Sequence, residues 1–152
     1  LKDVYGELMT LPENKLRFLE LEGGQTDKRQ FSSFAVETMP MKHSQESIAY
    51  RITDSDGKSL VYSGDTDTTE NLVTLAAGAD LLICESAMPD ALKVPGHLTP
   101  SLAGDLAARA RVKKLVLTHL YPECDQFDIA DQCRRTYPGP LVIAEDLMRM
   151  EV

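Results

Sequence analysis

The sequence contains little of what several classes of protein need. Its 152 residues include no tryptophan, only three cysteines and only three histidines. The cysteines form no Cys-x-x-Cys pair, and their odd number does not suit a closed set of disulfides. No apolar run approaches the roughly 18 residues that a membrane-spanning helix requires. We therefore expect a soluble protein of a reducing, cytoplasmic setting that has no membrane partner.

Basic residues are also scarce. Sixteen Lys and Arg stand against 24 Asp and Glu, which gives a net charge of −8. An acidic surface argues against nucleic acid as the main partner, because phosphate binding depends on clustered positive charge. The length suits one domain better than two, so we expect residues 1–152 to belong to a single domain. The chain starts without methionine, and we expect its gene to begin further upstream.

The first part of the chain predicts β-strands. Residues 15–21 alternate apolar and charged side chains from Leu16 on, which is the period of a half-buried strand, and a Gly-Gly turn follows at residues 23–24. Three further β-rich runs cover residues 31–39, 47–53 and 58–63. An Asp-Gly pair at residues 56–57 joins the last two runs and predicts a hairpin.

After residue 63 the pattern alternates between helices and short apolar strands. The expected helices cover residues 68–77, 99–110 and 128–136, and the expected strands cover residues 81–84, 114–118, 141–144 and 148–152. Apolar strands that alternate with helices indicate a sheet covered by helices. The fold class is therefore α/β (α+β), with an antiparallel beginning and an alternating end.

Three of these strand-like runs lead into residues that bind metals: His43, Asp65 and His119. Ligand sites in sheet proteins gather at strand ends, where the backbone is held rigidly. Imidazole and carboxylate are ligands of zinc, manganese or iron, and the two oxygens of Asp65 could bridge two ions. The alternative is that the histidines are hydrogen-bonded structural residues and that Asp65 is a turn residue. Position alone leaves both interpretations open.

The third histidine, His97, lies in a loop that leads into the helix starting near Thr99-Pro100. A helix N-terminus favours a nearby anion. Glu85 ends the preceding apolar strand and could reach His97, fix its tautomer and support proton transfer. The alternative is a capping loop that carries an exposed histidine.

Other polar residues suggest structural roles. We expect Cys84 to be a core thiol, and neither Cys124 nor Cys133 has a base at the spacing of an activated nucleophile. Asp67 resembles part of a metal-binding loop with Asp65, but we favour a charge near the start of a helix. Asp146 could support a metal ligand, but we favour a turn residue.

Taken together, five short motifs resemble the second half of a metallo-β-lactamase-fold hydrolase of the ribonuclease Z-like branch. The motifs are MKHS with the following IAYRI (residues 41–52), SGDT (63–66), ICESA (83–87), GHLT (96–99) and LVLTH (115–119). The resemblance runs from about residue 16 to the end of the chain. It implies the C-terminal portion of a four-layer αββα sandwich with a two-metal site between its sheets.

The resemblance also implies roles for individual residues. His43 would bind the first metal ion, Asp65 would bridge both ions and His119 would bind the second. His97 would be the proton-donating or phosphate-contacting histidine, with Glu85 as its acidic partner. The implied reaction is attack of water, activated by two zinc or manganese ions, on a phosphodiester or related ester.

Two features depart from the family pattern. The H-x-H-x-D-H motif that supplies the other ligands is absent, so we expect the chain to be a fragment that is inactive alone and binds metal weakly or not at all. We expect it to pair with the missing N-terminal portion or to form a homo-oligomer. His43 and Asp65 are only 22 positions apart, which leaves no room for a tRNA-binding arm. This favours a small ester or phosphodiester substrate.

Two alternatives remain open at this stage: a ribonuclease Z-type enzyme that processes tRNA 3′ ends, and a degenerate scaffold domain without metal. We favour the enzyme, because a decayed site should have lost some of its residues. All three histidines, Asp65 and Glu85 are retained.

Overall fold

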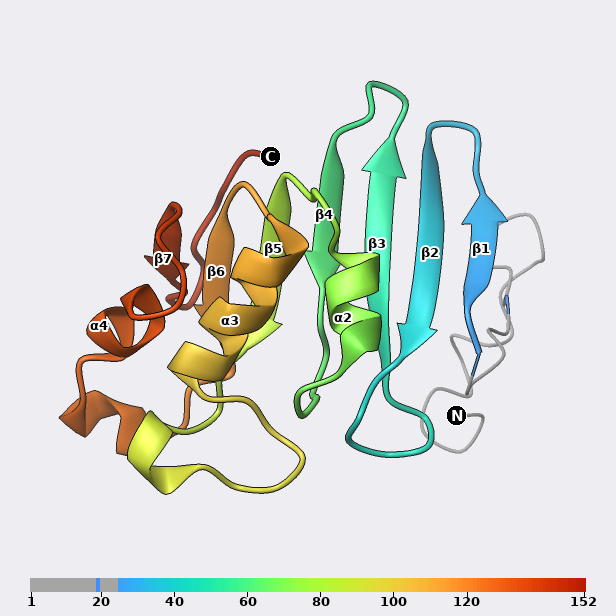
Figure 1. Ribbon diagram of the computed structural model, residues 1–152. Coiled ribbons are helices and arrows are strands. Elements are labelled where there is room, and N and C mark those ends of the chain that lie inside the picture. Colours follow the sequence, from blue (N-terminus) through green and yellow to red (C-terminus); the bar gives the residue numbers. More distant parts are fainter. Residues whose placement is uncertain (1–18, 20–24) are drawn as a thin grey trace, which may run out of the picture.

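A computed structural model describes residue 19 and residues 25–152, which form one seven-stranded sheet with helices on one face (Figure 1). The strands lie in the sheet in their order in the sequence: β1 (Asp27–Gln30), β2 (Phe34–Pro40), β3 (Ile48–Asp54), β4 (Ser59–Tyr62), β5 (Leu81–Glu85), β6 (Leu115–Thr118) and β7 (Leu141–Ile143). The helices are α2 (Glu70–Leu75), α3 (Pro100–Ala110) and α4 (Ile129–Arg134), with 3-10 turns at Asp90–Leu92 and Pro122–Gln126.

The sheet has an antiparallel half and a parallel half. Strands β1 to β4 pair antiparallel, whereas β4 to β7 pair parallel. Parallel neighbours need a long crossover, and here α2, α3 and α4 supply the three crossovers. The predicted α/β (α+β) class, with its antiparallel beginning and alternating end, is confirmed.

The β3–β4 connection is the tight hairpin that the Asp-Gly pair predicted. Gly57 has a φ of +83°, a conformation that glycine adopts without steric cost. The Asp54 side chain accepts hydrogen bonds from the backbone N–H groups of Asp56 (2.9 Å) and Lys58 (2.8 Å). Two strands and this short turn therefore fill most of the chain between His43 and Asp65.

The core lies between the sheet and its helices. Val61, Leu82 and Leu115 are neighbours across β4, β5 and β6, and all three are fully buried. They belong to one cluster with Leu72 of α2 and Leu106 of α3. Because side chains alternate along a strand, every second residue of the parallel strands faces this core.

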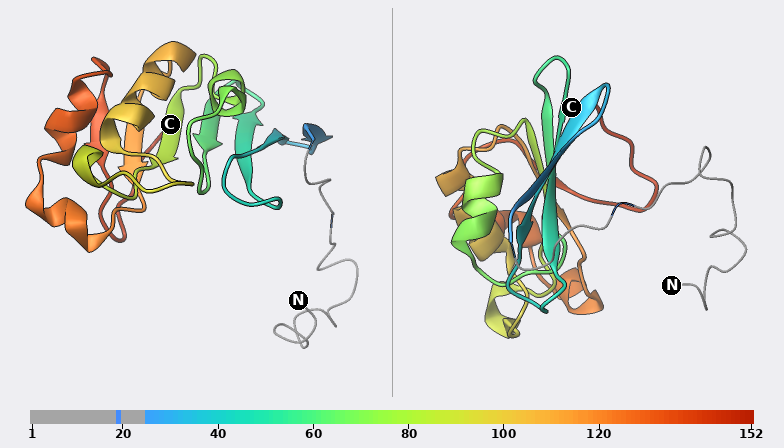
Figure 2. Two further views of the ribbon diagram at one scale, coloured as in Figure 1. Left: turned by 60° about the horizontal axis from the view of Figure 1, so that its bottom comes forward. Right: turned by 90° about the vertical axis from the view of Figure 1, so that its right-hand side faces the viewer.

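The other face of the sheet carries the intervening side chains. Tyr50, Tyr62, Ile83 and Val116 are partners across four strands, and Tyr62 is 46% exposed. The α-helices lie on the opposite side (Figure 2). The residues that the structure describes thus form one sheet layer and one helix layer, which matches half of a four-layer sandwich.

Some expected elements differ from the structure. The strand predicted at residues 148–152 is wrong: the chain turns at Leu147 (φ +64°), and no strand of the described residues pairs with the segment that follows. Strand β1 was missed because its sequence is entirely polar and it needs only backbone pairing at the sheet edge. Helices α2 and α4 are shorter at both ends than expected. The strand and turn expected within residues 15–24 lie, except for Leu19, outside the described residues. Among the helices of the described part, none has the length and apolar character to span a bilayer.

Candidate functional site

One edge of the sheet collects the chemically active side chains. Strands β4, β5 and β6 are parallel, so their carboxyl ends meet at one edge, and β2 has the same direction because both β2 and β4 pair antiparallel with β3. Asp65 follows β4, Glu85 ends β5, His119 follows β6 and His43 follows β2, while His97 precedes α3. Ligands bind at this edge in open α/β sheets.

The structure brings together all five residues that the sequence singled out. The imidazole centroids of His43 and His97 lie 4.7 Å apart, and those of His97 and His119 lie 5.5 Å apart. One ligand atom each from His43, Asp65 and His97 lies within 4.8 Å of the other two. His119 Nε2 lies 3.7 Å from Asp65 Oδ1. Asp65 therefore lies near all three histidines, of which His43 and His119 are exposed.

Hydrogen bonds at Nδ1 orient two of the imidazoles. His43 Nδ1 lies 3.0 Å from the carbonyl oxygen of Gly96, and His97 Nδ1 lies 2.9 Å from Glu85 Oε1. Carbonyl and carboxylate oxygens only accept, so these contacts favour the neutral tautomer in which Nδ1 carries the hydrogen and Nε2 keeps a lone pair. This second contact behind an imidazole is the usual support of a metal-binding or proton-transferring histidine.

Glu85 is the buried centre of the site. It is 1% exposed, and its carboxylate accepts hydrogen bonds from the backbone N–H groups of Thr66 (2.8 Å), Ala87 (3.1 Å) and Leu98 (3.1 Å) besides the contact to His97. A buried carboxylate is tolerated only when it is fully hydrogen-bonded, as here. Glu85 thus ties the segment that carries Asp65 to the segment that carries His97.

A second carboxylate, Asp67, ties the same two segments. Its side chain accepts hydrogen bonds from Lys93 Nζ (3.0 Å) and from the N–H groups of Gly96 (3.0 Å) and Thr68 (2.8 Å). Burial alone raises the pKa of the Asp67 carboxyl, but these three hydrogen bonds outweigh burial and lower the pKa to about 2. The sequence suggested a charge at a helix start, yet it is Thr69 whose side chain caps α2.

His119 has an unusual backbone and an aromatic neighbour. Its φ is +59°, a left-handed conformation that is uncommon for residues other than glycine and that often occurs at functional sites. The ring of Tyr121 lies edge-on to His119 at 5.2 Å and 6.2 Å from His97, and Tyr121 is 38% exposed. Sequence reasoning missed Tyr121, although its position two residues after a candidate ligand was a usable signal.

The cysteines lie away from this chemistry. All three are free and buried, which confirms the prediction that Cys84 is a core thiol. Burial raises the pKa of Cys84 and of Cys124, and it raises the pKa of Cys133 to about 11. A reactive thiolate needs a lowered pKa, so the structure gives no support to a nucleophilic cysteine.

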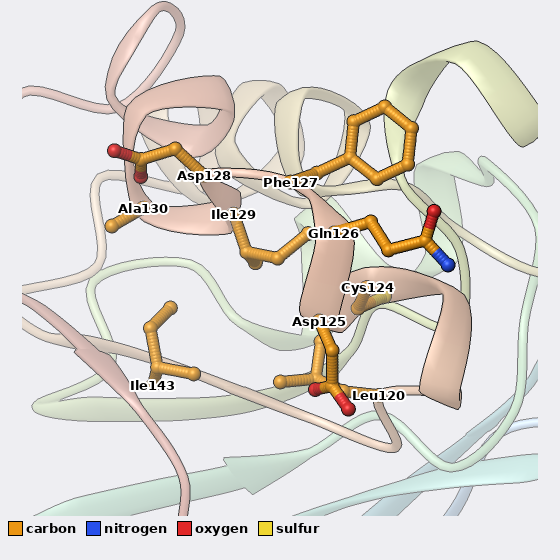
Figure 3. A pocket seen from close by; sticks show the side chains of 9 residues that line it. All are labelled: Leu120, Cys124, Asp125, Gln126, Phe127, Asp128, Ile129, Ala130 and Ile143. Carbon is orange, nitrogen blue, oxygen red and sulfur yellow. The ribbon is translucent and has the colours of Figure 1, made fainter.

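Two hollows lie near the end of β6, and the smaller one is lined in part by His119. The larger, of about 600 Å³, lies between the Pro122–Gln126 turn, α4 and β7 (Figure 3), and its lining is Leu120, Cys124, Asp125, Gln126, Phe127, Asp128, Ile129, Ala130 and Ile143. The smaller, of about 270 Å³, is lined by Thr118, His119, Leu120, Ala144, Glu145 and Asp146. Asp146 lies in a turn, as expected. The larger hollow contains no histidine, so the candidate metal ligands lie outside it, at the edge of β4 to β6.

The donor set fits a divalent transition metal. His43, Asp65 and His119 offer imidazole nitrogen and carboxylate oxygen, the donors that zinc and manganese accept. The Nε2 atom of His43 is available because Nδ1 is already engaged. The position of each residue is thus observed, whereas its role as ligand or proton carrier stays a prediction.

The sequence profile of the family described as "Beta-lactamase superfamily domain" matches residues 4–120. The chain belongs to the beta-lactamase superfamily. The profile covers the whole histidine site, and the fold is that of the metallo-β-lactamase hydrolases, a family that is typically metal-dependent. The predicted family is therefore confirmed.

Individual superfamily relatives agree over part of their length. An uncharacterized protein of Mycobacterium leprae is 42% identical over 101 residues, which is 65% of this chain and 36% of that protein. Ribonuclease Z of Archaeoglobus fulgidus is 34% identical over 102 residues, which is 63% of this chain and 33% of the enzyme. The chain thus spans about a third of the length of these curated relatives.

The fold agrees with a solved member of the superfamily. The metallo-beta-lactamase fold protein YhfI of Bacillus subtilis superposes with a TM-score of 0.75 at 22% sequence identity, over 94% of this chain and 59% of that chain. The partial coverage of YhfI accords with the single sheet layer seen here.

Proposed function

We propose that the protein is a metal-dependent hydrolase that acts on a phosphodiester or related ester. The observation that carries the proposal is the convergence of three histidines and Asp65 at one sheet edge, with two of the imidazoles already oriented by hydrogen bonds at Nδ1. A decayed scaffold site should have lost some of these residues, and all of them are retained.

The chain's own residues would hold two divalent ions, zinc or manganese. His43 would bind the first ion, His119 would bind the second, and the two oxygens of Asp65 would serve both. When bound, the ions lower the pKa of water and stabilise negative charge on the oxygens of the reacting ester. The position of His119 supports this assignment, because its Nε2 lies 3.7 Å from Asp65 Oδ1 directly after β6 ends.

His97 would carry the proton of the reaction. Its Nδ1 lies against Glu85, so Nε2 is the nitrogen left for proton transfer, and its ring lies next to those of His43 and His119. An imidazole held in this way can accept a proton at Nε2 and pass it to a leaving oxygen, because Glu85 stabilises the charged form. Glu85 is buried and touches no substrate, so its task is to orient His97.

The substrate that the chain suits best is small. Between His43 and Asp65 there is space only for the β3–β4 hairpin, and the net charge of −8 disfavours a long nucleic acid. The 34% identity to an archaeal ribonuclease Z favours a second candidate, cleavage of precursor tRNA at its 3′ side. The two candidates predict different substrates for one site.

We further propose that the helix-free face of the sheet is covered in the working protein. Tyr62 and Ile52 are exposed there, 46% and 39%, beside the half-buried Tyr50. Apolar side chains on a sheet face usually pack against a second layer. Our preferred cover is a second sheet supplied by the N-terminal portion that the family pattern leads us to expect. The alternative is a second copy of the chain, which sedimentation analysis would reveal.

The test combines metal content with hydrolysis. The protein is expressed with any sequence that precedes residue 1 in its gene, loaded with zinc or manganese and assayed on bis-p-nitrophenyl phosphate and on precursor tRNA. Asp65→Asn should lose metal and lower kcat by at least about 100-fold, because even the outer partners of metal ligands cost about 10–100-fold. His97→Gln should keep its metal and lower kcat by about 10²–10⁴-fold.

Three outcomes would contradict these assignments. Failure of the folded protein to bind either metal or to cleave either substrate would support the scaffold alternative. Clean 3′ cleavage of tRNA with no action on the small ester would overturn the small-substrate proposal. Loss of metal from His97→Gln would make His97 a ligand and not a proton carrier.

A further inference from the structure

Asp67 contacts the loop that precedes α3 at two points. Its Oδ2 accepts hydrogen bonds from the N–H of Gly96 and from Lys93 Nζ, each at 3.0 Å, across 29 and 26 positions of sequence. A charge near a helix start does not account for these contacts, because Thr69 is the residue that caps α2. Asp67 therefore links the segment after β4 to the loop at residues 93–96.

The residue that Asp67 holds is the residue that orients His43. The N–H of Gly96 donates to Asp67, and the carbonyl oxygen of Gly96 lies 3.0 Å from His43 Nδ1. The approach is close: Gly96 has a φ of +86°, and a Cβ added there would lie 3.1 Å from His43 Nδ1. Only glycine allows the imidazole to lie this near the backbone without displacement.

Glu85 does the same for the next histidine. Its two oxygens hold His97 Nδ1 and the N–H of Leu98. Asp67 and Glu85 thus fix neighbouring parts of one loop, and through it the two imidazoles whose centroids lie 4.7 Å apart. The difference is that Glu85 contacts His97 directly, whereas Asp67 contacts the N–H of Gly96, whose carbonyl oxygen in turn contacts His43.

We propose that Asp67 is a positioning residue: by holding the N–H of Gly96, it aims the Gly96 carbonyl at His43 and keeps His43 in the tautomer whose Nε2 can bind a metal ion. The inference rests on the proposed function in one respect, because metal binding at Nε2 of His43 is part of that function. The orientation of His43 itself can be tested without metal and without substrate.

The test is long-range ¹H–¹⁵N NMR of the histidine rings in the metal-free protein, above the pH at which imidazole is protonated. The wild-type protein should show His43 with its hydrogen on Nδ1. Asp67→Ala removes the acceptor of the Gly96 N–H, so the Gly96 carbonyl is no longer held against His43. The tautomer ratio of His43 should then change by about fivefold toward Nε2–H, which is the effect of losing about one hydrogen bond. Zinc affinity should also fall by about tenfold, the lower end of the effect of lost outer partners.

Two variants serve as matched controls. Asp80→Ala removes a carboxylate that also accepts from a backbone N–H (Ser59, 3.0 Å) and from a lysine (Lys113, 2.8 Å), but at the other end of the parallel strands. It should leave the His43 signals unchanged. Lys93→Ala removes the ion pair with Asp67 and keeps the hydrogen bond to Gly96, so it too should leave the His43 tautomer unchanged.

His43 signals identical to wild type in a folded Asp67→Ala variant would overturn the proposal, as would an equal shift in Asp80→Ala. If Asp67→Ala does not fold, Asp67→Asn replaces it. An amide oxygen is a weaker acceptor than a carboxylate, so a shift of about twofold in the same direction is expected, and no shift would overturn the proposal. Absence of metal binding in the wild-type protein would contradict the proposed function and leave the tautomer result standing.

Discussion

The two ends of the parallel strands use carboxylates in different ways. At the amino end, Asp80 accepts hydrogen bonds from the N–H and hydroxyl of Ser59 and forms an ion pair with Lys113. At the carboxyl end, Glu85 accepts from three backbone N–H groups and from His97. Both carboxylates join segments that are distant in the sequence, but only Glu85 has a titratable ring among its partners.

The difference separates stability from orientation. The partners of Asp80 are a strand start and the exposed ammonium groups of Lys113 and Lys58, so the contacts there fasten elements of the fold. Glu85 contacts His97 directly, and Asp67 holds Gly96, whose carbonyl oxygen contacts His43. The contacts at this end therefore favour particular tautomers of the two histidines. Substitutions at the amino end should therefore change stability alone, and substitutions at the carboxyl end should change both stability and histidine chemistry.

The largest effect is expected from Glu85→Ala. The substitution leaves three buried N–H groups and His97 Nδ1 without their acceptor, and losing one partner of a buried charged network costs about 3–5 kcal/mol. Urea unfolding followed by circular dichroism would measure the loss. A loss of less than about 1 kcal/mol would mean that water replaces the carboxylate and that Glu85 is not a structural centre.

Glu85→Gln provides the matched comparison for that variant. The amide keeps the shape of the side chain and one acceptor oxygen, but its nitrogen can only donate, so it faces the N–H groups that Glu85 now accepts from. We expect a smaller loss of stability than in Glu85→Ala and a comparable change in the NMR signals of the His97 ring. An unchanged His97 ring would contradict the orienting role.

An intermediate effect is expected at the amino end from Arg51→Ala. The Arg51 guanidinium donates to the carbonyl oxygens of Leu75 and Ala77 at the end of α2, both at 2.9 Å. Hydrogen bonds that involve a charged group contribute about 1.5–3 kcal/mol, so a loss of that size is expected in urea unfolding. The histidine ring signals should not move, and any shift would show that the two ends are coupled.

Arg51→Lys is the conservative companion. Lysine keeps the charge near the C-terminal end of α2 but lacks the fork that reaches two carbonyl groups. It should restore part of the stability that Arg51→Ala loses. Equal stability of Arg51→Lys and Arg51→Ala would mean that geometry and not charge decides the contact.

The smallest effect concerns acid stability at Asp80. Hydrogen bonds from Lys113 and from the Ser59 N–H lower the pKa of Asp80 below its ordinary value of 3.8. A lowered folded-state pKa adds stability that is fully present above the ordinary value and is lost as the pH falls through the folded-state pKa. Unfolding curves of the wild-type protein between about pH 5 and 2 should therefore decline more steeply than those of Asp80→Asn, which has no such charge to neutralise. Parallel curves would contradict the contribution of Asp80.

The positions of Asp65 and His119 at strand ends were predictable, because the runs that indicate the strands directly precede these residues in the sequence. The apolar runs before Asp65 and His119 indicate buried strands, and polar residues directly after such runs lie at a sheet edge whatever the rest of the fold does. The hairpin at Gly57 was predictable for the same reason, since an Asp-Gly pair determines its own turn. β1 was not predictable from its side chains, because a polar edge strand depends on the backbone of β2.

The partners of Asp67 could not be predicted from the residues near it in the sequence. Beside Asp65 and before Thr69 it suggests a charge at a helix start, and nothing near it in the sequence indicates Gly96 or Lys93 as its partners. Gly96 in turn gives no sign in the sequence that its carbonyl lies against His43. These contacts join β2, β4 and the loop before α3, and they exist only after the sheet has formed.

By itself, the sequence determined the alternation of strands and helices, the burial of Cys84 and the residues with the chemistry to bind a metal ion. These features depend on side-chain character and on spacing along the chain, which are local properties. Only the tertiary structure decided which nitrogen of the His43 and His97 imidazoles lies against an acceptor. That choice depends on an acceptor delivered from elsewhere in the fold, Gly96 for His43 and Glu85 for His97, and a hydrogen bond requires its partners within about 3 Å in space, however far apart they lie in the sequence.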